Sequence, residues 1–145
     1  MAEGKLNVPP HSMEAEKCTL GALLIDKDAI IKIADFLRAE DFYHQVHAMI
    51  YEAITDLYEK RSPIDLVTLT SHLEDRNQLK EIGGASYLAE LTNEVPTATH
   101  VFQYASIVKQ KSTLRRLIKA GHDIAALGYD EESDVEGLLE RAEKN

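Results

Sequence analysis

The feature of this sequence that most limits its fold is a long helical pattern near its end. From Thr97 onward, apolar residues recur at helical spacing for about eight turns without a proline. They are Val101, Tyr104, Ile107, Val108, Leu114, Leu117, Ile118, Ile124 and Ala125. A Gly-Tyr-Asp sequence at 128–130 breaks the pattern, and Ser133 or Asp134 can cap a last helix. A long helix followed by a short one predicts a helical hairpin.

The residues before this stretch also predict helices. Ser12 is a good N-cap for a helix that runs to about Leu24, and a short helix is expected over residues 30–37. The clearest apolar stripe, with steps of three and four, comprises Val46, Met49, Ile50, Ala53, Ile54, Leu57 and Tyr58. Asp65 can cap the next helix, and Gly83 precedes another. No segment alternates as a strand would.

We therefore expect an all-α protein in three parts. Residues 1–11, which include Pro9 and Pro10, form an extended N-terminal arm. Residues 12–96 form a compact helical head, and residues 97–145 form the helical hairpin. A chain of 145 residues is long enough for one domain with an appendage.

Charge and cysteine content favour a cytoplasmic protein with protein partners. Sixteen Lys and Arg against 25 Asp and Glu give a net charge of −9, which repels a polyanion, so we expect no strong nucleic-acid binding. Cys18 is the only cysteine, which rules out an internal disulfide. The chain starts without an apolar signal-peptide region, and its longest clean apolar run, residues 20–25, is far too short to span a membrane.

Sites for small ligands are poorly supported. His44 and His47 are three residues apart, but no third and fourth metal ligand follows at a suitable spacing, so we favour polar residues on an exposed first turn. Cys18 is expected to be a buried structural thiol rather than a nucleophile. No P-loop pattern is present, and we expect no cofactor for this chain.

A basic stretch offers one further alternative. Residues 109–119 contain five cations and no acid: Lys109, Lys111, Arg115, Arg116 and Lys119. They can grip phosphates, or they can form a solvated face matched to the acidic last helix. We favour the solvated face, since charge runs usually have that role.

Five segments together resemble the N-terminal domain of the DnaB family of bacterial replicative DNA helicases. They are residues 9–24, 41–51, 65–68, 83–88 and 95–118, with Leu-Gly-Ala-Leu-Leu at 20–24 and Gly-Gly-Ala-Ser-Tyr-Leu at 83–88 among the matching motifs. Their order and spacing extend over essentially the whole chain.

The resemblance implies a non-catalytic module of a larger machine. In the family, hairpins of two subunits pair, and the pairs assemble as a trimer of dimers, a collar beneath a ring of six ATPase motors. Primase docks on the collar through its C-terminal helicase-binding domain, and a helicase loader is a further candidate partner. The motor domain, with its P-loop, ATP and Mg²⁺, is expected after Asn145, so this chain is a truncated chain or a natural fragment without helicase activity.

The resemblance and the residues together suggest two surfaces. Glu14, Tyr87 and Ile118 are the residues expected to dock primase, although Tyr87 can equally be an ordinary core tyrosine. The long helix has apolar residues on two faces, so the hairpin is expected to self-associate. The expected self-association residues are Tyr104, Ile107, Leu114, Leu117, Gly121 and Ile124. Gly121 suggests a close approach by another helix.

Two other functions stay open at this point. A stand-alone helical adaptor that regulates another complex would have the same composition and pattern. A metalloenzyme built in a helical bundle would need inward Glu-x-x-His pairs, and none is found.

Overall fold

The computed structural model describes residues 8–145 and is all-α over that range, as the sequence predicts. The α-helices are α1 (Met13–Ile25), α2 (Gln45–Glu59), α3 (Leu66–Asp75), α4 (Gly84–Glu94), α5 (Val101–Leu127) and α6 (Val135–Glu143). Short 3-10 helices are η2 (Ala29–Lys32), η3 (Ala39–Asp41) and η4 (Ala98–His100). Most of the expected N-terminal arm, residues 1–7, lies outside the described residues.

The contacts divide the chain into two compact units. The head unit is 11–112, and the hairpin unit is 113–145 together with the segment that ends at Pro10. The head unit therefore runs past residue 96, where the sequence suggested its end. The reason is that the first turns of α5 bury Val101, Ala105 and Val108 in the head core.

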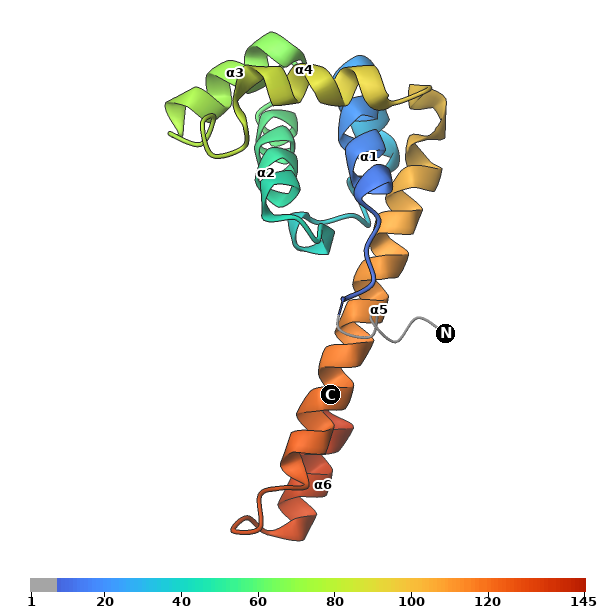
Figure 1. Cartoon of the computed structure of the whole chain (residues 1–145), viewed down its shortest axis with the longest axis vertical. Coiled ribbons are helices and arrows are strands. Elements are labelled where there is room, and N and C mark those ends of the chain that lie inside the picture. Colours follow the sequence, from blue (N-terminus) through green and yellow to red (C-terminus); the bar gives the residue numbers. More distant parts are fainter. Residues whose placement is uncertain (1–7) are drawn as a thin grey trace. The chain divides into compact units, whose positions relative to one another are not determined.

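Helix α1 is the central helix of the head. The Ser12 side chain caps it, because its Oγ accepts a 3.1 Å hydrogen bond from the N–H of Ala15. Helix α4 lies across α1 (Figure 1). Gly21 permits this crossing, since a Cβ at that position would lie 2.2 Å from the carbonyl oxygen of Leu91.

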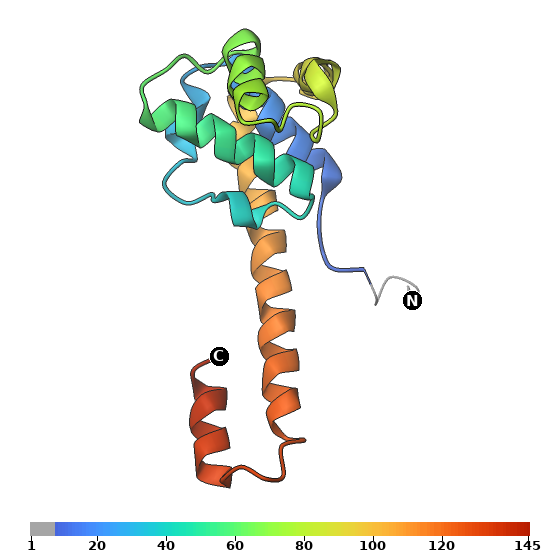
Figure 2. The same cartoon turned by 90° about the vertical axis from the view of Figure 1, so that its left-hand side faces the viewer.

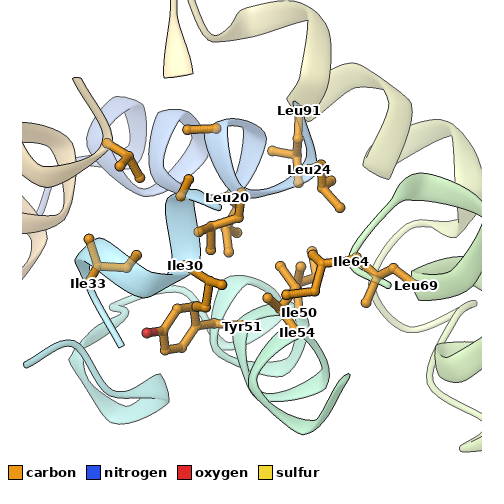
Figure 3. Packing of buried hydrophobic residues seen from close by; sticks show 14 of the residues in the cluster. Leu20, Leu24, Ile30, Ile33, Ile50, Tyr51, Ile54, Ile64, Leu69 and Leu91 are labelled. Carbon is orange, nitrogen blue, oxygen red and sulfur yellow. The ribbon is translucent and has the colours of Figure 1, made fainter. Parts of the chain in front are cut away.

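The head core lies between α1, α2 and the segments around them (Figure 3). The α2 stripe supplies Ile50 and Ile54, both fully buried, whereas Tyr58 at the end of the stripe is exposed. Tyr51, which also points into the core, donates a 2.9 Å hydrogen bond from its hydroxyl to the carbonyl of Leu37.

Local signals position α3 and α4. Asp65 caps α3 by accepting a 2.8 Å hydrogen bond from the N–H of Thr68, as predicted. Gly83 and Gly84 have φ of 104° and 78°, a left-handed backbone that glycine adopts without strain. The helix expected at 30–37 is instead the 3-10 helix η2 followed by turns, in which Ile30 and Ile33 reach the core.

In the hairpin unit, α6 turns back beside the last turns of α5 (Figure 2). No residue of α6 is fully buried. Val135 and Leu139 remain 68% and 62% exposed, so this pair of helices leaves much of its apolar surface uncovered.

Candidate interaction site

Three side chains from three helices form a hydrogen-bonded chain in the head. Glu16 of α1 and Nδ1 of His47 of α2 are 2.7 Å apart, and Nε2 of His47 is 2.5 Å from the hydroxyl of Tyr87 of α4. The side chains of His47 and Glu16 are only 1% and 2% exposed. Buried polar groups of this kind are tolerated because each one is hydrogen-bonded.

Glu16 also holds the start of α2. Its carboxylate accepts hydrogen bonds from the backbone N–H groups of Tyr43 (2.7 Å) and His44 (3.4 Å). His44 is the N-cap of α2 and makes no side-chain cap bond of its own. A negative charge beside the N-terminus of a helix is stabilising. Glu16 of α1 therefore takes the place of a local side-chain cap at the start of α2.

Tyr87 is half-buried, and its ring lies edge to edge with that of His47, at 5.9 Å between centroids and 8° between planes. The Nζ of Lys17 lies 6.0 Å from the ring centroid and pairs with Glu94 and Glu90 at 3.4 and 3.7 Å. Burial, and then the negative charges of Glu90, Glu94 and Glu16, raise the pKa of Tyr87 to about 12. The phenol is therefore neutral at physiological pH.

The sequence prediction was wrong for His47, which was expected on an exposed turn and is buried. For Tyr87 the sequence left an interface anchor and a core tyrosine open; the side chain is half-buried, with its hydroxyl bonded to His47. Glu16 was missed as a site residue. In the sequence it resembles Glu14, an ordinary acid in the first turn of a helix, so no signal set it apart. Within residues 8–145 no group of three or more His, Cys, Asp or Glu is arranged to hold a metal ion.

The three residues expected to dock primase are distributed over both units. Glu14 is exposed in the first turn of α1, and Tyr87 lies in the same head unit. The carboxylate that reaches the Tyr87 network comes from Glu16, not from Glu14. Ile118 belongs to the hairpin unit and is 46% exposed.

A second buried carboxylate, Asp41, binds the first part of α5. Asp41 has no exposed surface, and it accepts hydrogen bonds from Ser112 Oγ at 2.7 Å and from Lys109 Nζ at 3.1 Å. Burial alone would raise its pKa. The hydrogen bonds from the Arg38 N–H, Ser112 and Lys109 instead hold the pKa of Asp41 below its usual value.

The residues expected to mediate self-association lie along α5. In the head unit Tyr104 is half-buried against the core and Ile107 is 39% exposed. In the hairpin unit Leu114, Leu117 and Ile124 are 39%, 68% and 41% exposed.

Gly121 and a groove near the turn between α5 and α6 are two further features of the hairpin unit. No described atom outside Gly121's own helix lies within 4 Å of where a Cβ would be. Near the turn, Ile124, Leu127, Leu138 and Ala142 line a mainly apolar groove of about 410 Å³ between α5 and α6. The sequence had not identified the α6 side of this groove as part of a site.

The basic stretch makes individual contacts. Lys109 bonds to Asp41, and Arg115 donates a 2.7 Å hydrogen bond to the carbonyl of Pro10. Lys119 pairs at 2.9 Å with Asp123 of the same helix rather than with the acidic last helix.

Two further predictions concern the cysteine and membrane-spanning segments. Cys18 is 5% exposed and buried as predicted, and burial followed by the charges of Glu14 and Glu94 raises the pKa of its thiol. Between residues 8 and 145, no helix has both the length and the apolar character needed to cross a bilayer.

Comparisons with known proteins agree on one family. Residues 8–110 match the family model of the DnaB-like helicase N terminal domain. Over 137 residues the chain is 44% identical to the replicative DNA helicase DnaB of Geobacillus stearothermophilus and 44% identical to the replicative DNA helicase DnaC of Bacillus subtilis (strain 168). Each alignment includes 94% of this chain and 30% of the relative.

Solved structures show the same similarity. The N-terminal domain of DnaB helicase from Mycobacterium tuberculosis superposes with a TM-score of 0.89 at 43% identity, over 94% of this chain and 96% of that one. A DnaB-like replicative helicase, solved in a study of its interactions with primase, shares the fold with a TM-score of 0.74 at 23% identity. That match includes 90% of this chain and 31% of the other.

Proposed function

The chain belongs to the family of DnaB-like helicase N-terminal domains, and from this premise we propose that it is the collar of a replicative helicase, where it pairs subunits and receives primase. Because the chain spans about 30% of its curated relatives' length, we assign ATP hydrolysis, Mg²⁺ binding and DNA unwinding to the rest of such a helicase. The proposal includes a helicase loader as a further partner and places the protein in the cytoplasm.

The observation that carries the proposal is the uncovered apolar surface of the hairpin unit. Leu117, Val135 and Leu139 are each more than 60% exposed, and α6 contributes no fully buried residue. Several large apolar side chains left exposed in one small unit are typical of an interface. A second hairpin supplies a matching surface, which supports a dimer as the unit of assembly. The trimer of dimers in a six-membered ring is proposed from the family resemblance alone.

Primase docking is the second part of the proposal. Tyr87 supplies a half-buried aromatic ring, the kind of residue that often anchors an interface. Ile118 is an exposed apolar residue on α5, and Glu14 offers an exposed carboxylate to a basic partner. Primase as the partner is supported by the similar fold of the DnaB-like replicative helicase whose structure was described together with its interactions with primase.

Two measurements test this function. Light scattering across a range of concentrations should show a mass above that of one chain. Calorimetric titration with the primase C-terminal domain should show binding that Tyr87→Ala and Ile118→Ala each weaken by about thirtyfold, whereas Glu14→Ala should have a smaller effect that declines in high salt. A monomer at every concentration would contradict the pairing. Wild-type affinity in both the Tyr87→Ala and Ile118→Ala variants, with folding confirmed by circular dichroism, would place the docking surface elsewhere.

A further inference from the structure

The hydrogen-bonded chain of Glu16, His47 and Tyr87 runs from a buried carboxylate to a half-buried phenol. Glu16 accepts from two backbone N–H groups and lies 2.7 Å from Nδ1 of His47. A carboxylate only accepts, so Nδ1 of His47 carries a proton and donates it. The other ring nitrogen, Nε2, forms a 2.5 Å hydrogen bond with the Tyr87 hydroxyl, so the imidazole links the carboxylate to the phenol.

This arrangement orients the ring of Tyr87. The hydroxyl of Tyr87 is bound to His47, and its Cα lies in the first turn of α4, three residues after Gly84. The two rings lie 8° from parallel with the hydrogen bond between their edges, so the bond fixes the plane of the phenol as well as the position of its hydroxyl. Tyr87 therefore has its hydroxyl bound inward to His47 and offers a partner its ring.

We propose that Glu16 and His47 are positioning residues for Tyr87, which hold its ring in the orientation that docks an apolar pocket of a protein partner. Both side chains are 2% exposed or less, so they act on a partner only through Tyr87. The inference rests on the proposed function, since it takes the primase C-terminal domain as the partner that contacts Tyr87. It adds the chemistry of the contact to that function: Tyr87 meets the primase domain with its aromatic ring and not with its hydroxyl group.

The energetic basis is preorganisation. A side chain that is already held in its bound conformation loses less freedom when the partner arrives. Tyr87→Phe keeps the ring and removes only the tether to His47. We expect this variant to bind the primase domain about three- to tenfold more weakly, from the size of one side-chain ordering cost or one neutral hydrogen bond.

The test is a double-mutant cycle on the full chain, with affinity for the primase C-terminal domain measured by calorimetry. The variants are Tyr87→Phe, His47→Gln and the two combined; a glutamine amide can reach Glu16 or Tyr87 but cannot bridge both. Tyr58→Phe is the matched control, because it removes a hydroxyl for which the described residues provide no hydrogen bond. If His47 acts through the hydroxyl, the double variant should bind no more weakly than the weaker single variant.

The outcomes separate this inference from the function it rests on. Wild-type affinity in Tyr87→Phe and His47→Gln, with Tyr87→Ala still weakened, overturns the positioning role and leaves primase docking in place. Losses that add in the double variant also overturn it, because His47 then acts by another route. Wild-type affinity in Tyr87→Ala overturns the docking role of Tyr87 itself. If His47→Gln does not fold, the comparison of Tyr87→Phe with Tyr58→Phe decides the question.

Discussion

Asp41 accepts a 2.7 Å hydrogen bond from Ser112, which lies 71 positions later in the chain. This bond joins the short helix η3 to the fourth turn of α5, and Lys109 reaches the same carboxylate from one turn earlier. A carboxylate with no exposed surface is stable only when donors replace the water it has lost. Asp41 thus attaches α5 to the head core through polar contacts.

Replacing Ser112 with alanine should destabilise the head. A hydrogen bond to a charged group contributes roughly 1.5–3 kcal/mol, so we expect the free energy of unfolding to fall by about 2 kcal/mol in Ser112→Ala. Urea unfolding followed by circular dichroism gives the value. Ser106→Ala, on the same helix, is the control, since no hydrogen bond of its hydroxyl is found among residues 8–145. Equal stability of the two variants would show that the bond to Asp41 contributes nothing.

The stability of the head should fall in acid as Asp41 becomes protonated. Its folded-state pKa is lowered, so the folded protein prefers the ionised form more than the unfolded chain does. This stabilisation is complete above the ordinary aspartate pKa of about 3.9 and disappears as the pH falls through the folded-state pKa. Asp41→Asn should therefore be less stable than wild type near neutrality, and the gap should narrow in acid. A gap that stays constant down to the lowest pH at which both proteins fold would refute this assignment.

Gly21 should tolerate no side chain. A Cβ there would lie 2.2 Å from the backbone oxygen of Leu91 and 3.2 Å from Val95 Cγ1, and a backbone atom cannot rotate away. In Gly21→Ala, α1 and α4 must separate, and we expect a loss of at least 1–3 kcal/mol of stability, the typical cost of overpacking. Thermal unfolding measures the loss. A melting temperature at or above that of wild type would contradict the close crossing.

Gly121→Ala should have the opposite effect on a single chain. The space around Gly121 is open, and alanine is favoured over glycine inside a helix by about 1 kcal/mol. If two hairpins approach each other at Gly121, however, the added methyl group should weaken their association. We expect a higher melting temperature in dilute solution and a lower mass by light scattering in concentrated solution. An unchanged mass would place the contact between hairpins elsewhere on α5.

Leu117→Glu should dissociate the proposed pairs without unfolding the chain. Leu117 is 68% exposed, so in a single chain the new carboxylate reaches water. In a paired seam the same charge would be buried without a partner, at a cost of several kcal/mol. Light scattering should therefore report the mass of one chain, with an unchanged circular dichroism spectrum. His122→Glu, at an exposed polar position of the same helix, should keep the wild-type mass; loss of association in both variants would implicate net charge instead.

Local signals in the sequence were the most reliable guides to the fold. Ser12 and Asp65 cap their helices as predicted, because a cap involves a hydrogen bond only three residues away. The helix predicted at residues 30–37 was wrong. Apolar spacing does not distinguish an α-helix from a 3-10 helix followed by turns, because both place Ile30 and Ile33 in the core.

The candidate site was less accessible to sequence reasoning. Tyr87 was identified as a residue of interest, but its two supports were not, because His47 lies 31 positions from Glu16 and 40 positions from Tyr87. Each looks like an ordinary polar residue near the start of a helix. Only the packing of α1, α2 and α4 shows that both are buried and joined.

The burial of the only cysteine provides a natural reporter of how often the head opens. A thiol reagent reacts with the exposed thiolate, and Cys18 is 5% exposed with a pKa raised by burial. Alkylation of the native protein therefore has to wait for α1 to separate from its neighbours. When closing is faster than the reaction, the ratio of the labelling rates in the native and unfolded protein equals the opening equilibrium constant. One reagent, without any introduced probe, thus measures the local stability of the central helix in a free chain, in a paired hairpin or in a complex.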